Sequence, residues 1–141
     1  METKEKTVIT IEATVKAPVE KIWKYWSEPA HITQWAFASD DWHAPAAEND
    51  LRTGGKFSTT MAAKDGSFSF DFGGVYDKVE THKTIDYTIA DGRKVMTSFL
   101  PSGNETKIVQ SFEAEDQNSI DMQRGGWQAI LNNFRSYVEN N

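Results

Sequence analysis

The segment from Phe57 to Ala114 constrains the fold most, because it is a succession of alternating stretches separated by turns, with no helical pattern between them. Two of the turns, Asp65-Gly66 and Asp91-Gly92, are dipeptides typical of tight β-hairpins, and a third reads Pro101-Ser102-Gly103-Asn104. Repeated strands with short turns and no intervening helix predict an antiparallel meander. Such a sheet usually has one face in water and one face covered by another layer.

Period-two alternation predicts which side chains share a face of each strand. Val8 to Lys16 is a half-buried strand ahead of the meander, and its inward residues are Ile9, Ile11, Ala13 and Val15. In the meander the residues that share a face are Phe57, Thr59 and Met61; Phe68, Phe70 and Phe72; Ile85, Tyr87 and Ile89; and Ile108, Gln110 and Phe112 within Thr106 to Ala114. Val75 to Val79 continues the strand that holds Phe72, and Val95 to Leu100 is a further strand. Gly73-Gly74 is expected to mark a bulge that bends its strand.

Two short helices are expected after the first strand. Ala17-Pro18 ends that strand, and helical spacing then connects Val19, Ile22, Trp23 and Trp26. Pro29 starts a second helix, whose apolar side holds Ile32 and Trp35. The residues from Ala36 to Gly55 show no period, and we interpret them as a long loop. Loops of this length inside a compact domain are often functional.

A long helix is expected at the C-terminus, where it covers the sheet. Ser119 is a suitable N-cap, and Asp121 suits the positive end of the helix dipole. The apolar stripe of this helix consists of Ile120, Trp127, Ile130, Leu131, Phe134, Tyr137 and Val138. Gly125-Gly126 lies inside the helix, and each such glycine costs roughly 1 kcal/mol relative to alanine. We expect either close approach of the sheet backbone or room left for another molecule to compensate for this cost.

This order of elements resembles the helix-grip fold of START-like and Bet v 1-like proteins. That is an α+β fold in which a curved antiparallel sheet wraps around a long C-terminal helix. Several segments also resemble the domain shared with activators of the Hsp90 ATPase: Ala17-Pro18-Val19-Glu20-Lys21-Ile22-Trp23, Pro29 through Gln34-Trp35, Gly54-Gly55-Lys56-Phe57, Gly73-Gly74-Val75-Tyr76 and Gly125-Gly126-Trp127-Gln128-Ala129-Ile130-Leu131. The resemblance spans nearly the whole chain, and we expect one such domain over residues 1–141.

Relatives with this fold carry lipids, sense hormones, cyclise polyketides or assist chaperones, so the resemblance leaves several functions open. We rank binding of a small lipophilic molecule first and an enzyme of the polyketide cyclase, dehydratase or hydrolase type second. Contact with the Hsp90 chaperone ranks third, because eukaryotic activators carry a further N-terminal domain and only a few residues precede the first predicted strand, which begins at Val8 here. Such a contact requires an exposed apolar patch, with Trp42 as a candidate member.

The composition limits the kinds of partner that the protein can bind and the cellular location that we expect for it. The chain has 141 residues, no cysteine and a net charge of −6, with a pI near 5.0. That charge disfavours nucleic-acid binding, and the lack of cysteine excludes disulfides and thiolate metal sites. No run approaches the ~20 apolar residues of a membrane span, so we expect no membrane insertion. Met1 to Lys6 is charged and precedes no apolar stretch of the signal-peptide type, so we expect a cytoplasmic protein, either a monomer or a homodimer.

The aromatic residues are expected to converge between the sheet and the C-terminal helix. They either fill a packed core or line a cavity of ligand size, which this architecture commonly leaves between its layers. The residues expected to bind a small lipophilic molecule there are Trp35, Phe37, Phe57, Thr59, Phe68, Phe70, Phe72, Tyr87, Phe99, Gln110, Phe112, Gly126, Trp127, Ile130 and Phe134.

Polar side chains on the inward strand faces would give such a cavity its specificity. They are Thr59, Tyr87, Thr97 and Gln110. Gln110 is the sharpest case, because a buried amide without a partner costs roughly 1–3 kcal/mol. We expect its partner to be the backbone, a trapped water or a carbonyl or hydroxyl group of the ligand.

The enzyme alternative requires an ionisable group of shifted pKa at the cavity. Tyr87 is the best candidate acid, with His31 or His43 reaching in from the rim. The run Asp40-Asp41-Trp42-His43 lacks the usual spacing of zinc ligands, and His82 pairs with no other histidine. Because the Gly-x-Ser-x-Gly, P-loop and Rossmann patterns are also absent, we expect no metal and no cofactor.

Overall fold

The computed structural model describes residues 7–141, and the charged segment Met1 to Lys6 lies outside the described residues. Within that range the elements follow one another as β1 (Val8–Val15), α1 (Val19–Ser27), α2 (Pro29–Trp35), β2 (Trp42–Asn49), β3 (Lys56–Ala63), β4 (Ser69–Glu80), β5 (Thr84–Ile89), β6 (Lys94–Ser102), β7 (Glu105–Glu113) and α3 (Ile120–Glu139).

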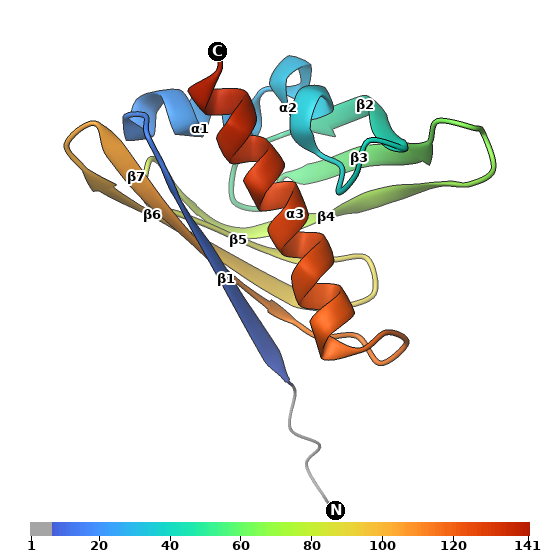
Figure 1. Ribbon diagram of the computed structural model, residues 1–141. Helices are drawn as coiled ribbons and strands as arrows, with labels where there is room; N and C mark the ends of the chain where they lie inside the picture. Colours follow the sequence, from blue (N-terminus) through green and yellow to red (C-terminus); the bar gives the residue numbers. More distant parts are fainter. Residues whose placement is uncertain (1–6) are drawn as a thin grey trace, which may run out of the picture.

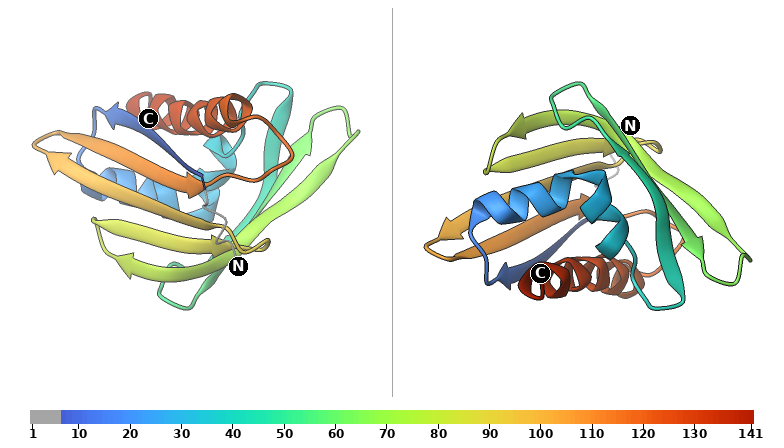
Figure 2. Two further views of the ribbon diagram at one scale, coloured as in Figure 1. Left: turned by 90° about the horizontal axis from the view of Figure 1, so that it is seen from below. Right: turned by 90° about the horizontal axis from the view of Figure 1, so that it is seen from above.

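The strands form one antiparallel sheet in the order β1-β7-β6-β5-β4-β3-β2. The first strand pairs with the last, with Val8 opposite Glu113 and Val15 opposite Thr106. Figure 1 shows α3 running across the concave face of the sheet, while α1 and α2 cover one end. The curvature of the sheet is clearest in the two views of Figure 2. The predicted helix-grip fold is therefore confirmed.

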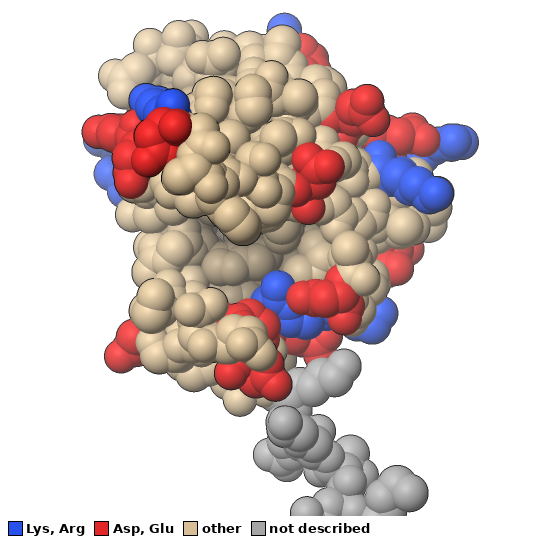
Figure 3. All heavy atoms as spheres, turned by 90° about the vertical axis from the view of Figure 1, so that its right-hand side faces the viewer, with Lys and Arg blue, Asp and Glu red and all other residues tan. Residues whose placement is uncertain are grey.

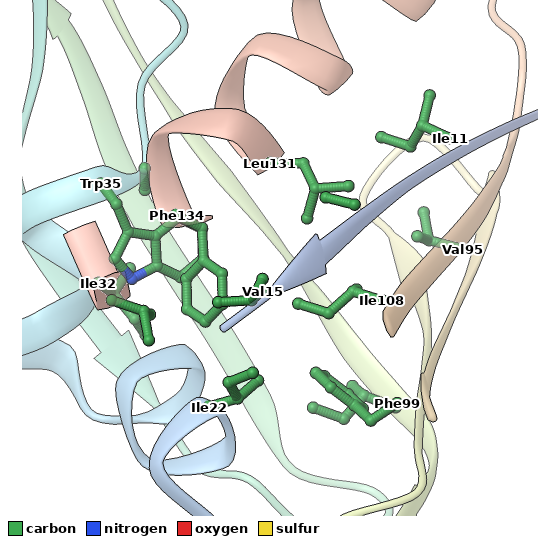
Figure 4. Close-up of a cluster of buried hydrophobic side chains, with 14 of the residues drawn as sticks. Ile11, Val15, Ile22, Ile32, Trp35, Val95, Phe99, Ile108, Leu131 and Phe134 are labelled. Carbon is green, nitrogen blue, oxygen red and sulfur yellow. The ribbon is translucent and has the colours of Figure 1, made fainter. Parts of the chain in front are cut away.

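The packed part of the interior lies where α1, α2 and α3 meet the sheet, as Figure 4 shows. Phe134 is fully buried, and its ring centroid lies 4.9 Å from those of both Trp26 and Trp35. The indole Nε1 of Trp35 donates a hydrogen bond of 3.0 Å to the Tyr25 carbonyl oxygen, so its polar end is satisfied within the core. These contacts fix α2 against both α1 and α3.

The interpretation of Ala36 to Gly55 as one long loop was wrong, because Trp42–Asn49 forms strand β2. This strand lies at the edge of the sheet and pairs only with β3 among the described residues. An edge strand tolerates proline, and Pro45 lies where the pairing register shifts, between His43 and Ala46. The alternation of apolar residues is absent here, and Ala44 is the one buried residue of β2.

The bulge expected at Gly73-Gly74 was also misplaced. Pairing of β4 with β3 continues unbroken through both glycines, and the irregularity in its pairing with β5 lies between Tyr76 and Lys78. The two glycines instead allow the backbones of the neighbouring strands β3 and β5 to lie close to β4. A Cβ atom on Gly74 would lie 2.2 Å from the Thr88 carbonyl oxygen, and one on Gly73 would lie 2.7 Å from that of Phe57.

The glycine pair in α3 does not lie against the backbone of a neighbouring element. A Cβ atom on Gly125 or Gly126 would meet no atom within 4 Å, so close approach of the sheet backbone does not explain the two glycines.

Ser119 caps the helix as predicted, with its side chain accepting a hydrogen bond from the Met122 amide. Ile120 lies in the first turn and is exposed, so it is no part of the buried stripe. No helix within residues 7–141 combines the length and the apolar character needed to cross a membrane.

Candidate functional site

A cavity of about 320 Å³ lies between the sheet and α3. Ligand pockets typically measure about 300–1,000 Å³, so this one suits a small molecule. Figure 3 shows a hollow on the side of the molecule where the β3–β4 hairpin, the β5–β6 turn and the beginning of α3 lie. The cavity wall is mostly apolar and consists of Trp26, Ile32, Trp35, Ala36, Glu48, Asn49, Phe57, Thr59, Met61, Phe70, Phe72, Tyr76, Ile85, Tyr87, Arg93, Gln110, Trp127, Ile130 and Leu131.

Most residues predicted to bind a ligand lie on this wall. They are Trp35, Phe57, Thr59, Phe70, Phe72, Tyr87, Gln110, Trp127 and Ile130. They come together because the inward faces of β3, β4, β5 and β7 all point toward the same side of α3.

The other predicted residues do not line the cavity: Phe37, Phe68, Phe99, Phe112, Gly126 and Phe134. Phe99 and Phe134 belong to the packed core instead, and the ring of Phe112 stacks on Trp127 at 4.0 Å. Phe68 precedes β4 and is 59% exposed, so it does not share the inward face of Phe72.

Several residues on the wall were not predicted from the sequence: Trp26, Ile32, Ala36, Glu48, Asn49, Met61, Tyr76, Ile85, Arg93 and Leu131. Trp26, Ile32 and Leu131 were recognised only as members of apolar helix faces. Glu48 and Asn49 lie on β2, which the sequence pattern does not reveal. Arg93 follows a turn, and nothing in its local sequence points to the cavity.

Three polar groups on the wall make no hydrogen bond to a residue of the described range 7–141. Gln110 is buried, and its amide nitrogen donates a hydrogen bond of 3.0 Å to the Thr97 hydroxyl. This side-chain partner was not among those predicted from the sequence. The amide oxygen of Gln110 and the hydroxyls of Thr59 and Tyr87 make no hydrogen bond to residues 7–141. No described side-chain polar atom is both fully enclosed and unpaired, so these three atoms retain some access to solvent, and all three residues line the cavity.

Tyr76 is held differently from Tyr87. Its hydroxyl donates to the side-chain oxygen of Asn49, and the Asn49 amide nitrogen donates at 2.6 Å to the Ser27 carbonyl oxygen. This chain of hydrogen bonds ties β4 and β2 to the end of α1. Burial raises the pKa of both tyrosines above their ordinary value, and the adjacent Tyr76 raises that of Tyr87 further.

The histidines do not line the cavity. The Nδ1 atom of His31 lies 2.7 Å from the Tyr137 hydroxyl, and its ring stacks on Tyr25. His43 lies on β2, and His82 adopts a positive φ in the β4–β5 turn beside Trp23. Within residues 7–141 no three histidines and carboxylates gather as a metal site would require.

Replacing Tyr87 with phenylalanine should reduce the loss of stability at high pH. The pKa of Tyr87 is higher in the folded than in the unfolded protein, so above about pH 10 the unfolded chain binds fewer protons and the free energy of unfolding falls as pH rises. One such group contributes a slope of up to about 1.4 kcal/mol per pH unit, and Tyr87→Phe should remove it. Urea unfolding between pH 8 and pH 11.5 measures this slope. At pH 7 the two proteins should agree within about 0.5 kcal/mol. Equal slopes for both would contradict the assignment.

These features define a helix-grip protein whose sheet and C-terminal helix enclose an apolar cavity with a few polar groups. A family model described as "Activator of Hsp90 ATPase homolog 1-like protein" matches residues 16–139, and the chain belongs to this family. The search of curated proteins returned no match.

Solved structures with the same fold include relatives of clear sequence similarity. The AHSA1-like protein of Aeromonas hydrophila is 40% identical, with a TM-score of 0.89 over 95% of this chain and 93% of that chain. A protein of Cytophaga hutchinsonii is 62% identical, with a TM-score of 0.81 over 94% of this chain and 92% of that one. A Nitrosomonas europaea protein at 18% identity has a TM-score of 0.81 over 94% of each chain, which is a likeness of fold alone.

Proposed function

We propose that this protein binds a small lipophilic molecule in the cavity between the sheet and α3, as a carrier or a sensor. The observation that carries the proposal is the combination of an apolar wall with three polar groups, on Thr59, Tyr87 and Gln110, that have no partner among the described residues. Apolar surface favours a lipophilic body, while the unpaired polar groups favour a molecule with its own hydrogen-bonding atoms. In a site of this kind the burial of apolar ligand surface provides affinity, and the hydrogen bonds select among ligands.

The arrangement favours binding over catalysis. The titratable side chains on the wall are Glu48, Tyr76, Tyr87 and Arg93, and Tyr76 is already hydrogen-bonded to Asn49. A tyrosine is protonated at neutral pH, and burial raises the pKa of Tyr87 further, so its hydroxyl can donate to a ligand. A general base within reach of that hydroxyl is required for acid–base chemistry, and no histidine lines the cavity.

Filling the cavity should abolish binding without unfolding the protein. Ile130 lies on α3 and lines the cavity, so Ile130→Trp places a larger ring in its empty space. We expect the affinity for N-phenyl-1-naphthylamine, a neutral fluorescent probe, to fall at least about tenfold, which corresponds to about 1.4 kcal/mol. Trp26, Trp35 and Trp127 also line the cavity, so probe binding should change the tryptophan fluorescence of the unsubstituted protein.

The matched control is Ile120→Trp, the same substitution in the exposed first turn of the same helix. Its affinity should stay within about twofold of that of the unsubstituted protein, because Ile120 does not line the cavity. Circular dichroism melting should show that both variants fold. Unchanged probe affinity in Ile130→Trp, or no probe binding to the unsubstituted protein, would argue against a ligand site here. Native mass spectrometry of protein purified without detergent would then identify any retained molecule.

A second candidate is contact with an Hsp90-class chaperone, which the family description suggests. It is favoured by an aromatic patch of Trp42, Phe68 and Phe70, whose ring centroids lie about 6 Å apart. Phe68 and Phe70 are both exposed, and large exposed apolar patches often mark interaction sites. The ATPase rate of Hsp90 with and without the protein tests this candidate, and an unchanged rate at saturating concentrations would remove it.

A further inference from the structure

Arg93 is a charged residue on the cavity wall, and a purely lipophilic ligand does not explain its presence there. It follows the β5–β6 turn, lines the cavity and has a side chain that is only 23% exposed. Its Nε donates to Asp91 Oδ2 at 2.8 Å, and its Nη1 donates to the Glu113 carbonyl oxygen at 3.3 Å. The remaining N–H groups of the guanidinium make no hydrogen bond to residues 7–141. Two hydrogen bonds thus hold the guanidinium of Arg93 in place and leave its other N–H groups available to a ligand.

A second arginine in the chain shows that this burial is not required by the ion pair itself. Arg52 follows Asp50 just as Arg93 follows Asp91, and its Nε lies 2.9 Å from Asp50 Oδ2. Its side chain is nevertheless 76% exposed and lies outside the cavity. The Asp-x-Arg pair is therefore stable on the surface, and the position of Arg93 follows from the packing of its turn against the cavity.

We propose that the ligand is a lipophilic carboxylic acid, whose carboxylate pairs with Arg93 while its hydrocarbon body occupies the apolar cavity. This inference rests on the proposed function. A guanidinium presents its N–H groups in a planar fork that matches the two oxygens of a carboxylate, and no lysine within residues 7–141 lines the cavity to compete with it. An arginine already held by Asp91 and the Glu113 backbone loses less freedom when it binds, which favours affinity.

The hydroxyl of Tyr87 is the natural second donor to the same carboxylate. It lines the same cavity and lacks a partner among residues 7–141. The positive charge of Arg93 acts on it, because it partly offsets the rise in the pKa of Tyr87 that burial causes. The Tyr87 hydroxyl and the Arg93 guanidinium can therefore both donate hydrogen bonds to the carboxylate of the ligand.

Glu48 carries the other charge on the wall and would favour an amine instead. Its side chain is exposed and makes no hydrogen bond or ion pair with a residue of the described range. A solvated carboxylate contributes little to an ion pair, because water screens it and the side chain must be ordered first. The half-buried and fixed Arg93 is therefore the stronger determinant.

Three probes with the same ten-carbon chain test the proposal: decanoic acid, 1-decanol and decylamine. Their affinities are measured at pH 7.5 by displacement of N-phenyl-1-naphthylamine. We expect decanoate to bind at least about tenfold more tightly than decanol. Arg93→Gln should abolish this preference and leave the affinity for decanol within about twofold. Arg93→Lys keeps the charge and should retain part of the preference, while Arg52→Gln should leave all three affinities unchanged.

The outcomes separate this inference from the function on which it rests. If decanol and decanoate bind equally well, or if Arg93→Gln leaves the preference for the acid intact, the carboxylate assignment is overturned and the lipophilic site stands. Tightest binding of decylamine also overturns it, in favour of Glu48. If the probe and all three ten-carbon compounds fail to bind the unsubstituted protein, both the inference and the proposed function are wrong.

Discussion

Phe134→Ala will lower the free energy of unfolding by about 3–5 kcal/mol, which is a large share of the stability of a typical domain. Phe134 is fully buried between Trp26 and Trp35, so the lost ring leaves a cavity that two large indoles cannot easily refill. The melting temperature should fall by about 10–20 °C. Urea unfolding followed by circular dichroism measures the change in free energy directly.

Phe68→Ala is the matched control, because it removes the same ring from an exposed position. Its effect on the free energy of unfolding should stay within about 0.5 kcal/mol, as for most surface substitutions. A loss below about 1 kcal/mol in Phe134→Ala would mean that the junction of the three helices is not the rigid part of the core. The cavity beside it would then have no fixed wall on that side.

Gly74→Ala will destabilise the protein by about 3 kcal/mol or more, although it adds a single methyl group. The new Cβ atom would lie 2.2 Å from the Thr88 carbonyl oxygen and 3.0 Å from the Ile89 Cα atom. Both belong to the backbone of β5, so the two strands must separate and their hydrogen bonds must weaken. A loss of soluble protein, or a melting temperature lower by at least about 10 °C, is the expected result.

The matched control makes the same change in α3. A Cβ atom on Gly126 would meet no atom within 4 Å, so Gly126→Ala should stabilise the protein by roughly 1 kcal/mol through helix propensity. Opposite signs for the two glycine substitutions are the diagnostic outcome. If Gly74→Ala melts at the same temperature as the unsubstituted protein, the close approach of β4 and β5 does not hold in solution.

The fold could be predicted because its signals are short-range. Strand alternation, the Asp-Gly turns and the Ser119 cap each depend on a few neighbouring residues, and the structure shows them as expected. Strand β2 escaped prediction for the opposite reason. Its sequence, Trp42–Asn49, has no buried alternation, and it is a strand because β3 offers it a free edge.

The candidate site was predictable only in its general character. The alternation along β3 and β5 correctly placed Phe57, Thr59 and Tyr87 on the inward face. It could not separate residues of the packed core, such as Phe99 and Phe134, from those of the cavity wall, because both groups have the same periodicity.

Apart from strand β2, the sequence by itself determined the order of the strands and helices, most of their inward faces and the family to which the chain belongs. The tertiary structure alone decided where the interior is filled and where it is left open, since that depends on how α3 lies across the curved sheet. It also brought Arg93, from a surface turn, to the same cavity as Gln110 and Trp127. Local patterns report burial, whereas the shape of a cavity is set by contacts between residues far apart in the chain.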